Sequence, residues 1–211
     1  MPSGGSARIL IVSLAFLILF FGLTRKVPAV TFTTVDFPGA FITVATGINN
    51  SGQIVGRHGD INSFHGFLLS GGNFTTIDFP TVPQTWANDI NDAGQIAGTY
   101  FPGTFHGFVF TPGVGFSIIN FPGADSTRIE GINNFGSVVG SYHIVPFQLQ
   151  GEFHGFLRVG NTFTTIDFPC FPSFPQCGSF LSDIDNVSRA IVGGDYLLLP
   201  QDPLRNRQEI E

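Results

Sequence analysis

The amino-acid sequence predicts an all-β fold, and three observations support this class. Charged residues make up only 11% of the 211-residue chain. Gly (27), Phe (25) and Pro (14) are abundant, which is typical of short strands joined by tight turns and disfavours helical bundles and disordered chains. Three short phrases also recur along the chain at nearly constant spacing, which indicates a repeated unit.

The first thirty residues differ from the rest of the chain. Arg8 precedes an apolar run from Ile9 to Leu23 that contains no charged residue, and the small-residue sequence Val27-Pro28-Ala29 follows it. This order predicts a signal peptide over residues 1–29 and a secreted, extracellular or periplasmic protein. The alternative is a membrane anchor over residues 9–23 with the repeat domain outside, although this run is shorter than the roughly 20 residues of a spanning helix.

Charge argues against a nucleic-acid partner. Cleavage after Ala29 would remove Arg8, Arg25 and Lys26 but none of the fifteen acidic residues. The remaining chain is strongly acidic, and its net field repels nucleic acid and anionic membranes. We therefore expect a soluble exported domain that binds no nucleic acid.

The repeated phrases define four units. A phrase that ends in Phe-Pro occupies residues 32–38, 74–80, 116–122 and 163–169. A phrase of the type GINNSGQIVG occupies residues 47–56, 89–98, 131–140 and, in altered form, 183–193. A phrase that begins FHGF occupies residues 64–69, 105–110 and 153–158, with DYLLLP at 195–200 as an eroded fourth copy. A single repeat domain over residues 30–200 thus divides into units 31–72, 73–114, 115–161 and 162–200, and residues 201–211 form a polar tail.

Each unit contains four strand candidates, which gives sixteen in all. In the second unit they are FTTIDF, TWANDIN, GQIAGTY and FHGFVF, separated by Gly, Pro, Asn or Asp. The turns at Asn49–Gly52 and Asn91–Gly94 predict tight antiparallel hairpins, because Asn, Asp and Gly tolerate positive φ.

A period of about 42 residues with four strands per unit predicts a β-propeller-like fold. A parallel β-helix is the competing architecture, but its coils are usually shorter and need no hairpin. Four blades are few for a closed ring, so a homodimer that completes a larger ring is an alternative to a closed four-bladed monomer.

The repeated phrases resemble the HAF-type probable extracellular repeat of secreted bacterial proteins, over about residues 31–200. The family's His-Ala-Phe triplet is His-Gly-Phe here, beginning at His65, His106 and His154, and its usual Asp-Leu-Gly is Asp-Phe-Pro or Asn-Phe-Pro. The resemblance implies export and a propeller-like repeat. It implies no reaction, because it brings no catalytic residues.

Two sets of repeated polar residues could carry chemistry. The histidines are His65, His106 and His154, and the carboxylates are Asp36, Asp78 and Asp167, with Asn120 in the third copy. A ring of such residues could hold a metal ion, and paired carboxylates could hydrolyse a glycoside. Asn at one copy cannot titrate, so we expect structural roles, such as a His–Asp hydrogen bond within each unit, and neither a catalytic residue nor a metal or other cofactor.

The insertions at residues 143–152 and 170–179 interrupt the repeat, and insertions usually form loops on one face. Their aromatic residues Phe147, Phe171 and Phe174 could form a binding rim or cover a seam between blades. Cys170 and Cys177 are the only cysteines, and an oxidising compartment predicts a local disulfide that adds about 2 kcal/mol. A free redox pair is the alternative.

These features predict a secreted, non-catalytic binding or matrix module whose ligand is an extracellular carbohydrate or protein. The first alternative is a hydrolase or lyase that acts on an extracellular polysaccharide with carboxylates near the propeller axis. The second alternative is a degenerate repeat fragment without an activity of its own. No nucleophile, phosphate-binding or dinucleotide motif occurs in the sequence.

Overall fold

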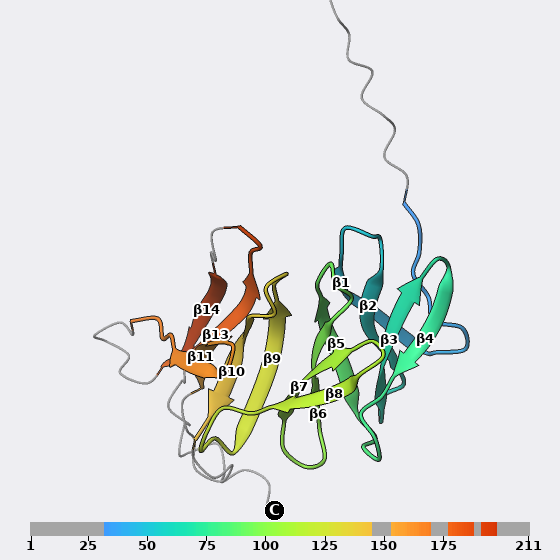
Figure 1. Ribbon diagram of the computed structural model, residues 1–211. Coiled ribbons are helices and arrows are strands. Elements are labelled where there is room, and N and C mark those ends of the chain that lie inside the picture. Colours follow the sequence, from blue (N-terminus) through green and yellow to red (C-terminus); the bar gives the residue numbers. More distant parts are fainter. Residues whose placement is uncertain (1–31, 145–152, 170–176, 188–190, 198–211) are drawn as a thin grey trace, which may run out of the picture. The chain divides into compact units, whose positions relative to one another are not determined.

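The computed structural model describes residues 32–144, 153–169, 177–187 and 191–197 (Figure 1). Every strand belongs to the unit Val35–Glu211. Fourteen strands and no helix occur in the described ranges, which confirms the all-β class. No helix in this described part could cross a membrane. The predicted signal peptide or anchor lies outside it.

The strands form three four-stranded sheets and one two-stranded sheet, each antiparallel and each in chain order. The first sheet contains β1 (Ile42–Ile48), β2 (Ile54–Gly59), β3 (Phe64–Ser70) and β4 (Asn73–Ile77). The second contains β5 (Thr85–Ile90), β6 (Ile96–Tyr100), β7 (His106–Thr111) and β8 (Gly115–Ile119). The third contains β9 (Ser126–Ile132), β10 (Val138–His143), β11 (His154–Val159) and β12 (Thr162–Thr165). The fourth contains β13 (Cys177–Ile184) and β14 (Ile191–Leu197).

The sheets are offset by one strand from the predicted units. The FTTI strand was expected to open a unit, but β4 and β8 instead complete the sheet of the preceding FHGF strand. Only the short turn at Gly71-Gly72 separates β3 from β4, so these two strands pair as a hairpin. Pro80 then follows β4 and cannot donate a hydrogen bond to a sheet, so the chain passes on to the next sheet.

The interpretation of DYLLLP as a fourth FHGF strand is wrong. β14 pairs directly with β13, and Gly193 lies opposite Leu181 as Gly98 lies opposite Ala87. Residues 195–197 therefore continue the second strand of the fourth sheet. The alignment failed because a Gly-aromatic pattern occurs in both strand types. The first Phe-Pro phrase, residues 32–38, also forms no strand, so fourteen strands are described where sixteen were predicted.

The predicted asparagine hairpins are confirmed. β1 pairs antiparallel with β2, and β5 pairs antiparallel with β6. Asn49 shapes its turn by accepting hydrogen bonds from the backbone N–H groups of Ser51 (3.1 Å) and Gln53 (3.0 Å). Gly52 has a φ of 72°, which the turn requires and a side chain would disfavour.

The core consists of apolar contacts between successive sheets. Each contact joins a residue of one sheet's second strand to two residues of the next sheet's first strand. These groups are Val55 with Ala87 and Ile90, Ala97 with Ile129 and Ile132, and Val139 with Leu181 and Ile184. All nine side chains are at most 4% exposed. Each of the first three sheets therefore depends on the next one for its burial.

Hydrogen bonds join the same sheets at their turns. Asn49 donates from Nδ2 to the backbone carbonyl of Asn91 at 3.1 Å, and Asn91 donates in the same way to Asn133 at 3.1 Å. Asn133 donates to the carbonyl of Asp185 at 3.3 Å. We call these three bonds the asparagine ladder. The ladder runs in one direction, from the side chain of each sheet to the backbone of the next.

Candidate binding site

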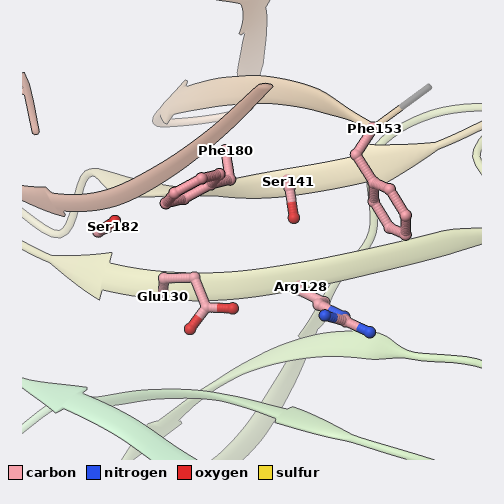
Figure 2. Close-up of a pocket in the computed structure, with 6 residues that line it drawn as sticks. All are labelled: Arg128, Glu130, Ser141, Phe153, Phe180 and Ser182. Carbon is pink, nitrogen blue, oxygen red and sulfur yellow. The ribbon is translucent and has the colours of Figure 1, made fainter. Parts of the chain in front are cut away.

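A pocket of about 500 Å³ lies where the third and fourth sheets meet (Figure 2). Arg128 and Glu130 come from β9, Ser141 from β10, and Phe180 and Ser182 from β13, while Phe153 directly precedes β11. Figure 2 shows Ser141 between the rings of Phe180 and Phe153. The pocket thus combines two charged side chains, two hydroxyl groups and two aromatic rings.

Glu130 occupies a special place in its strand. The first strand of each sheet contains a β-bulge, and the bulged residues are Thr46, Asn88, Glu130 and Ser182. A bulge redirects a side chain out of the regular alternation and often lies near a functional site. The bulge in β9 therefore sets the direction in which the Glu130 carboxylate leaves the strand.

The first two bulged residues join neighbouring sheets. Thr46 donates from Oγ1 to the carbonyl of Ala87 at 2.7 Å, and Asn88 donates from Nδ2 to the carbonyl of Ile129 at 2.6 Å. Glu130 replaces these neutral donors with a carboxyl group, and it has no hydrogen-bond partner among the described residues. Its carboxylate lines the pocket instead of bridging the sheets.

Burial raises the pKa of the Glu130 carboxyl, and the positive charges of Arg128 and Arg57 oppose this shift. A raised pKa favours the protonated, hydrogen-bond-donating form of this carboxyl group more than in an exposed glutamate. Perturbed carboxyl groups in pockets are characteristic of functional sites, which makes Glu130 the central residue of this candidate site.

Arg128 forms one wall of the site through its contacts with aromatic rings. Its guanidinium carbon lies 3.8 Å from the ring centroid of Phe105 and 5.6 Å from that of Phe153. Between the first and second sheets, Arg57 of β2 lies 5.4 Å from the ring of Trp86 of β5. Both cations lie over aromatic faces, an arrangement that holds a guanidinium in place while its edge can still donate hydrogen bonds.

A second depression, of about 400 Å³, lies among the turns that follow the first strand of each sheet. Asp89 and Asp183 both line it. Asp89 accepts hydrogen bonds from the backbone N–H groups of Ile90 (2.8 Å) and Ile132 (2.8 Å), whereas Asp183 accepts one from Ile184 (2.7 Å). Burial raises the pKa of Asp89, and the nearby charge of Asp183 raises it further.

The structure pairs the predicted histidines with residues of their own sheets. His65 Nδ1 lies 2.8 Å from Asp78 Oδ2, and His154 Nδ1 lies 2.9 Å from Asp167 Oδ2. In the second sheet, His106 Nδ1 lies 3.1 Å from Asn120 Nδ2. These pairs remain in separate sheets and do not converge. Asp36 is exposed and lies in none of these pairs.

The Asp-Phe-Pro phrase has a structural explanation. Asp78 pairs with a histidine of the first sheet, while the next residue, Phe79, stacks on Tyr100 of the second sheet at 3.7 Å. The N–H of Phe79 donates to Thr85 Oγ1 at 2.9 Å, and the same bond recurs from Phe37 to Thr43, from Phe121 to Thr127 and from Phe168 to Ser179. The phrase therefore fastens the end of one sheet to the start of the next.

Several predicted residues lie outside the described ranges. These are Phe147, Phe171 and Phe174 of the predicted rim and Cys170 of the predicted disulfide. The rim and the Cys170–Cys177 bridge therefore stay predictions. Within the described ranges no group of three or more His, Cys, Asp or Glu side chains could hold a metal ion.

Arg128 and Glu130 were missed from the sequence, although a signal was present. Alignment of the units on the GINN phrase places Glu130 at the same position as Thr46, Asn88 and Ser182. A charged residue among neutral equivalents, in a chain with few charges, marks a departure from the repeat. Comparison of the chain with protein-family models and with curated proteins found no match.

Proposed function

We propose that this protein is a secreted, non-catalytic binding module of the HAF-repeat type with a propeller-like arrangement of four repeats, and that it binds an extracellular carbohydrate. The observation that carries the proposal is the half-buried Glu130 carboxyl group beside Arg128 in the pocket between the third and fourth sheets. The apolar run at residues 9–23 and the acidic balance of the rest of the chain support export.

The chemistry of the pocket suits a sugar unit. Sugars present hydroxyl groups that need donors and acceptors, together with C–H faces that pack on aromatic rings. Glu130 and Arg128 provide an acceptor and donors, Ser141 and Ser182 provide hydroxyl groups, and the Phe153 and Phe180 rings provide apolar surface. A volume of about 500 Å³ accommodates one or two sugar rings and is too small for a folded protein partner.

Glycan binding tests this proposal. The purified chain without residues 1–29 is screened against immobilised bacterial and plant oligosaccharides, and each hit is measured by calorimetry. We expect Glu130→Gln to weaken binding at least about tenfold, because an amide cannot accept a charged hydrogen bond. Asp125→Asn is the matched control, because Asp125 is an exposed carboxylate directly before β9 that does not line the pocket. Equal affinity of both variants for every glycan would exclude this pocket as the binding site.

A hydrolase or lyase is the second candidate, and one observation favours it. Asp89 and Asp183 line a single depression, and paired carboxylates are the usual machinery of glycoside hydrolysis. However, both oxygens of Asp89 accept backbone hydrogen bonds, which indicates a structural role. Reducing-sugar release from soluble polysaccharides, lost in Asp183→Asn and kept in Asp78→Asn, would establish the enzyme in place of the binding module.

A further inference from the structure

Within the described residues, two sheets each lack one of the contacts that join successive sheets. The fourth sheet has no following sheet there, and the first sheet has no preceding one. Val55, Ala97 and Val139 occupy the same register position in their sheets and are each 0% exposed, because the next sheet covers them. Val192 occupies this position in the fourth sheet, opposite Asp183, and is 64% exposed. The fourth sheet therefore has the second-strand residue of an inter-sheet contact, but no first strand of a following sheet covers it among the described residues.

The first strand of the first sheet, β1, is uncovered in the complementary way. Ile90, Ile132 and Ile184 close β5, β9 and β13, and each is at most 4% exposed because it packs against the preceding sheet. Ile48 closes β1 in the same way but is 66% exposed. Ala45 and Thr46 beside it are exposed as well, although Ala87 is fully buried. One face of β1 thus lacks the neighbour that its equivalents have.

The polar groups on the two faces are also complementary. Thr46 and Asn88 each donate to a carbonyl of the following sheet. The N–H groups of Asn50, Asp92 and Asn134 donate to the Oδ1 atom of the matching turn residue in the next sheet. On the fourth sheet the N–H of Asn186 is the equivalent donor, and on the first sheet Asn50 Oδ1 is the equivalent acceptor. Neither has such a partner in the described part of the chain.

A carboxylate completes this match. Asp89 accepts a hydrogen bond from the N–H of Ile132 in the next sheet at 2.8 Å. Asp183 occupies the same position in β13, is exposed, and uses Oδ1 for its own neighbour Ile184. The corresponding N–H on the first sheet belongs to Ile48. The Asp183 carboxylate is therefore a matching acceptor, and the N–H of Ile48 a matching donor, on the two uncovered faces.

We propose that the fourth sheet of one molecule docks onto the first sheet of a second copy of this chain. The contact continues an interface that the chain already makes three times, with Val192 against Ala45 and Ile48, and with Asp183 and Asn186 facing the backbone and turn of β1. It is heterologous, because two different faces meet. The apolar contact excludes water, and the polar groups fix the register.

Light scattering after size-exclusion chromatography tests this association on the exported chain. We expect the wild-type protein to have at least twice the monomer mass at tens of micromolar. Ile48→Lys blocks one face and Val192→Lys blocks the other, so each variant alone should be monomeric. Both positions are exposed in the single chain, and circular dichroism checks that the variants fold. Val114→Lys is the control, because Val114 is 81% exposed in the β7–β8 hairpin and should not change the mass.

Mixing the two variants provides the decisive measurement. Ile48→Lys retains an intact fourth-sheet face, and Val192→Lys retains an intact first-sheet face. We expect an equimolar mixture to form a one-to-one dimer, although neither variant self-associates. A monomeric wild-type protein would overturn the proposal and indicate that the faces close on each other or are covered by other parts of the chain. Self-association of either single variant, or a mixture that stays monomeric, would also overturn it.

Discussion

The side chain of Asn91 joins the second sheet to the third, since its Nδ2 atom lies 3.1 Å from the backbone carbonyl oxygen of Asn133. The same side chain shapes its own turn, because Oδ1 accepts hydrogen bonds from the N–H groups of Ala93 (3.1 Å) and Gln95 (2.9 Å). One buried amide therefore serves both the hairpin and the packing of sheets.

Asn91→Ala should destabilise the protein by about 2–3 kcal/mol, because it leaves buried backbone groups without partners. Asn91 is 3% exposed, so water cannot easily replace the lost bonds. Urea unfolding followed by tryptophan fluorescence measures the change in the free energy of unfolding. Asn73→Ala is the control, because Asn73 is exposed and makes only a long 3.4 Å bond to Gly71. A loss no larger than that of the control would show that the asparagine ladder contributes little.

Gly98→Ala should destabilise the second sheet by at least about 2 kcal/mol, because it overpacks the core. A Cβ atom at Gly98 would meet the carbonyl oxygen of Trp86 and lie 2.5 Å from Cζ of the fully buried Phe108 ring. Thermal unfolding by circular dichroism detects this loss. Ser117→Ala, on the exposed face of β8, should leave the melting temperature nearly unchanged. Equal melting temperatures of the two variants would mean that the backbone can move away from the added methyl group.

Asp78→Asn should cost less than about 1 kcal/mol, because both His65 and Asp78 are partly exposed and such pairs contribute little. The second sheet already contains the amide version of this pair, with Asn120 beside His106. Chemical denaturation of Asp78→Asn and Asp78→Ala separates the hydrogen bond from the charge. If Asp78→Asn is as damaging as Asp78→Ala, the carboxylate charge has a role that this geometry does not explain.

The pKa of Glu130 predicts a pH-dependent stability. Because the folded state raises this pKa above the ordinary value of 4.5, the folded protein binds the proton more tightly than the unfolded chain does. The stabilisation is fully present below that ordinary value and is lost as the pH rises through the folded-state pKa. Glu130→Gln cannot titrate, so its free energy of unfolding should increase relative to that of the wild type over this range.

Urea unfolding at several pH values from about 4 to 8 measures this difference. Asp125→Asn serves as the matched control, because Asp125 is an exposed carboxylate that does not line the pocket. A difference between Glu130→Gln and wild type that does not change with pH would mean that Glu130 titrates as it does in the unfolded chain.

The sequence was sufficient to predict the strands and hairpins because their signals are local. Alternating β-branched and aromatic residues mark the strands, and Asn49 and Gly52 mark a turn through groups only a few residues apart. Which strands pair in the same sheet was harder to predict from the sequence. Phe79 follows β4 in sequence but stacks on Tyr100 of the next sheet, so the boundary between sheets falls inside a phrase that repeats as a block.

The pocket could not be predicted from a motif, because its residues come from four separate stretches of chain. Arg128 and Phe153 line the same space only because β9, β10 and β11 pair side by side, and Phe180 joins them because the fourth sheet packs on the third. The repeated His and Asp residues, in contrast, were easy to recognise in the sequence but do not form a common site. They were conspicuous in the sequence, but His65 and Asp78 pair within one sheet and line no shared site with His154 and Asp167.

The one-way direction of the asparagine ladder has a consequence for how such a chain can change in length. Each rung uses a side chain from one unit and a main-chain carbonyl from the next, and every residue supplies such a carbonyl whatever its identity. A unit carrying its own asparagine can therefore be added or removed without a matching substitution in its neighbour. Growth by duplication of whole units, in evolution or by gene assembly, needs no coordinated mutation at the new junction.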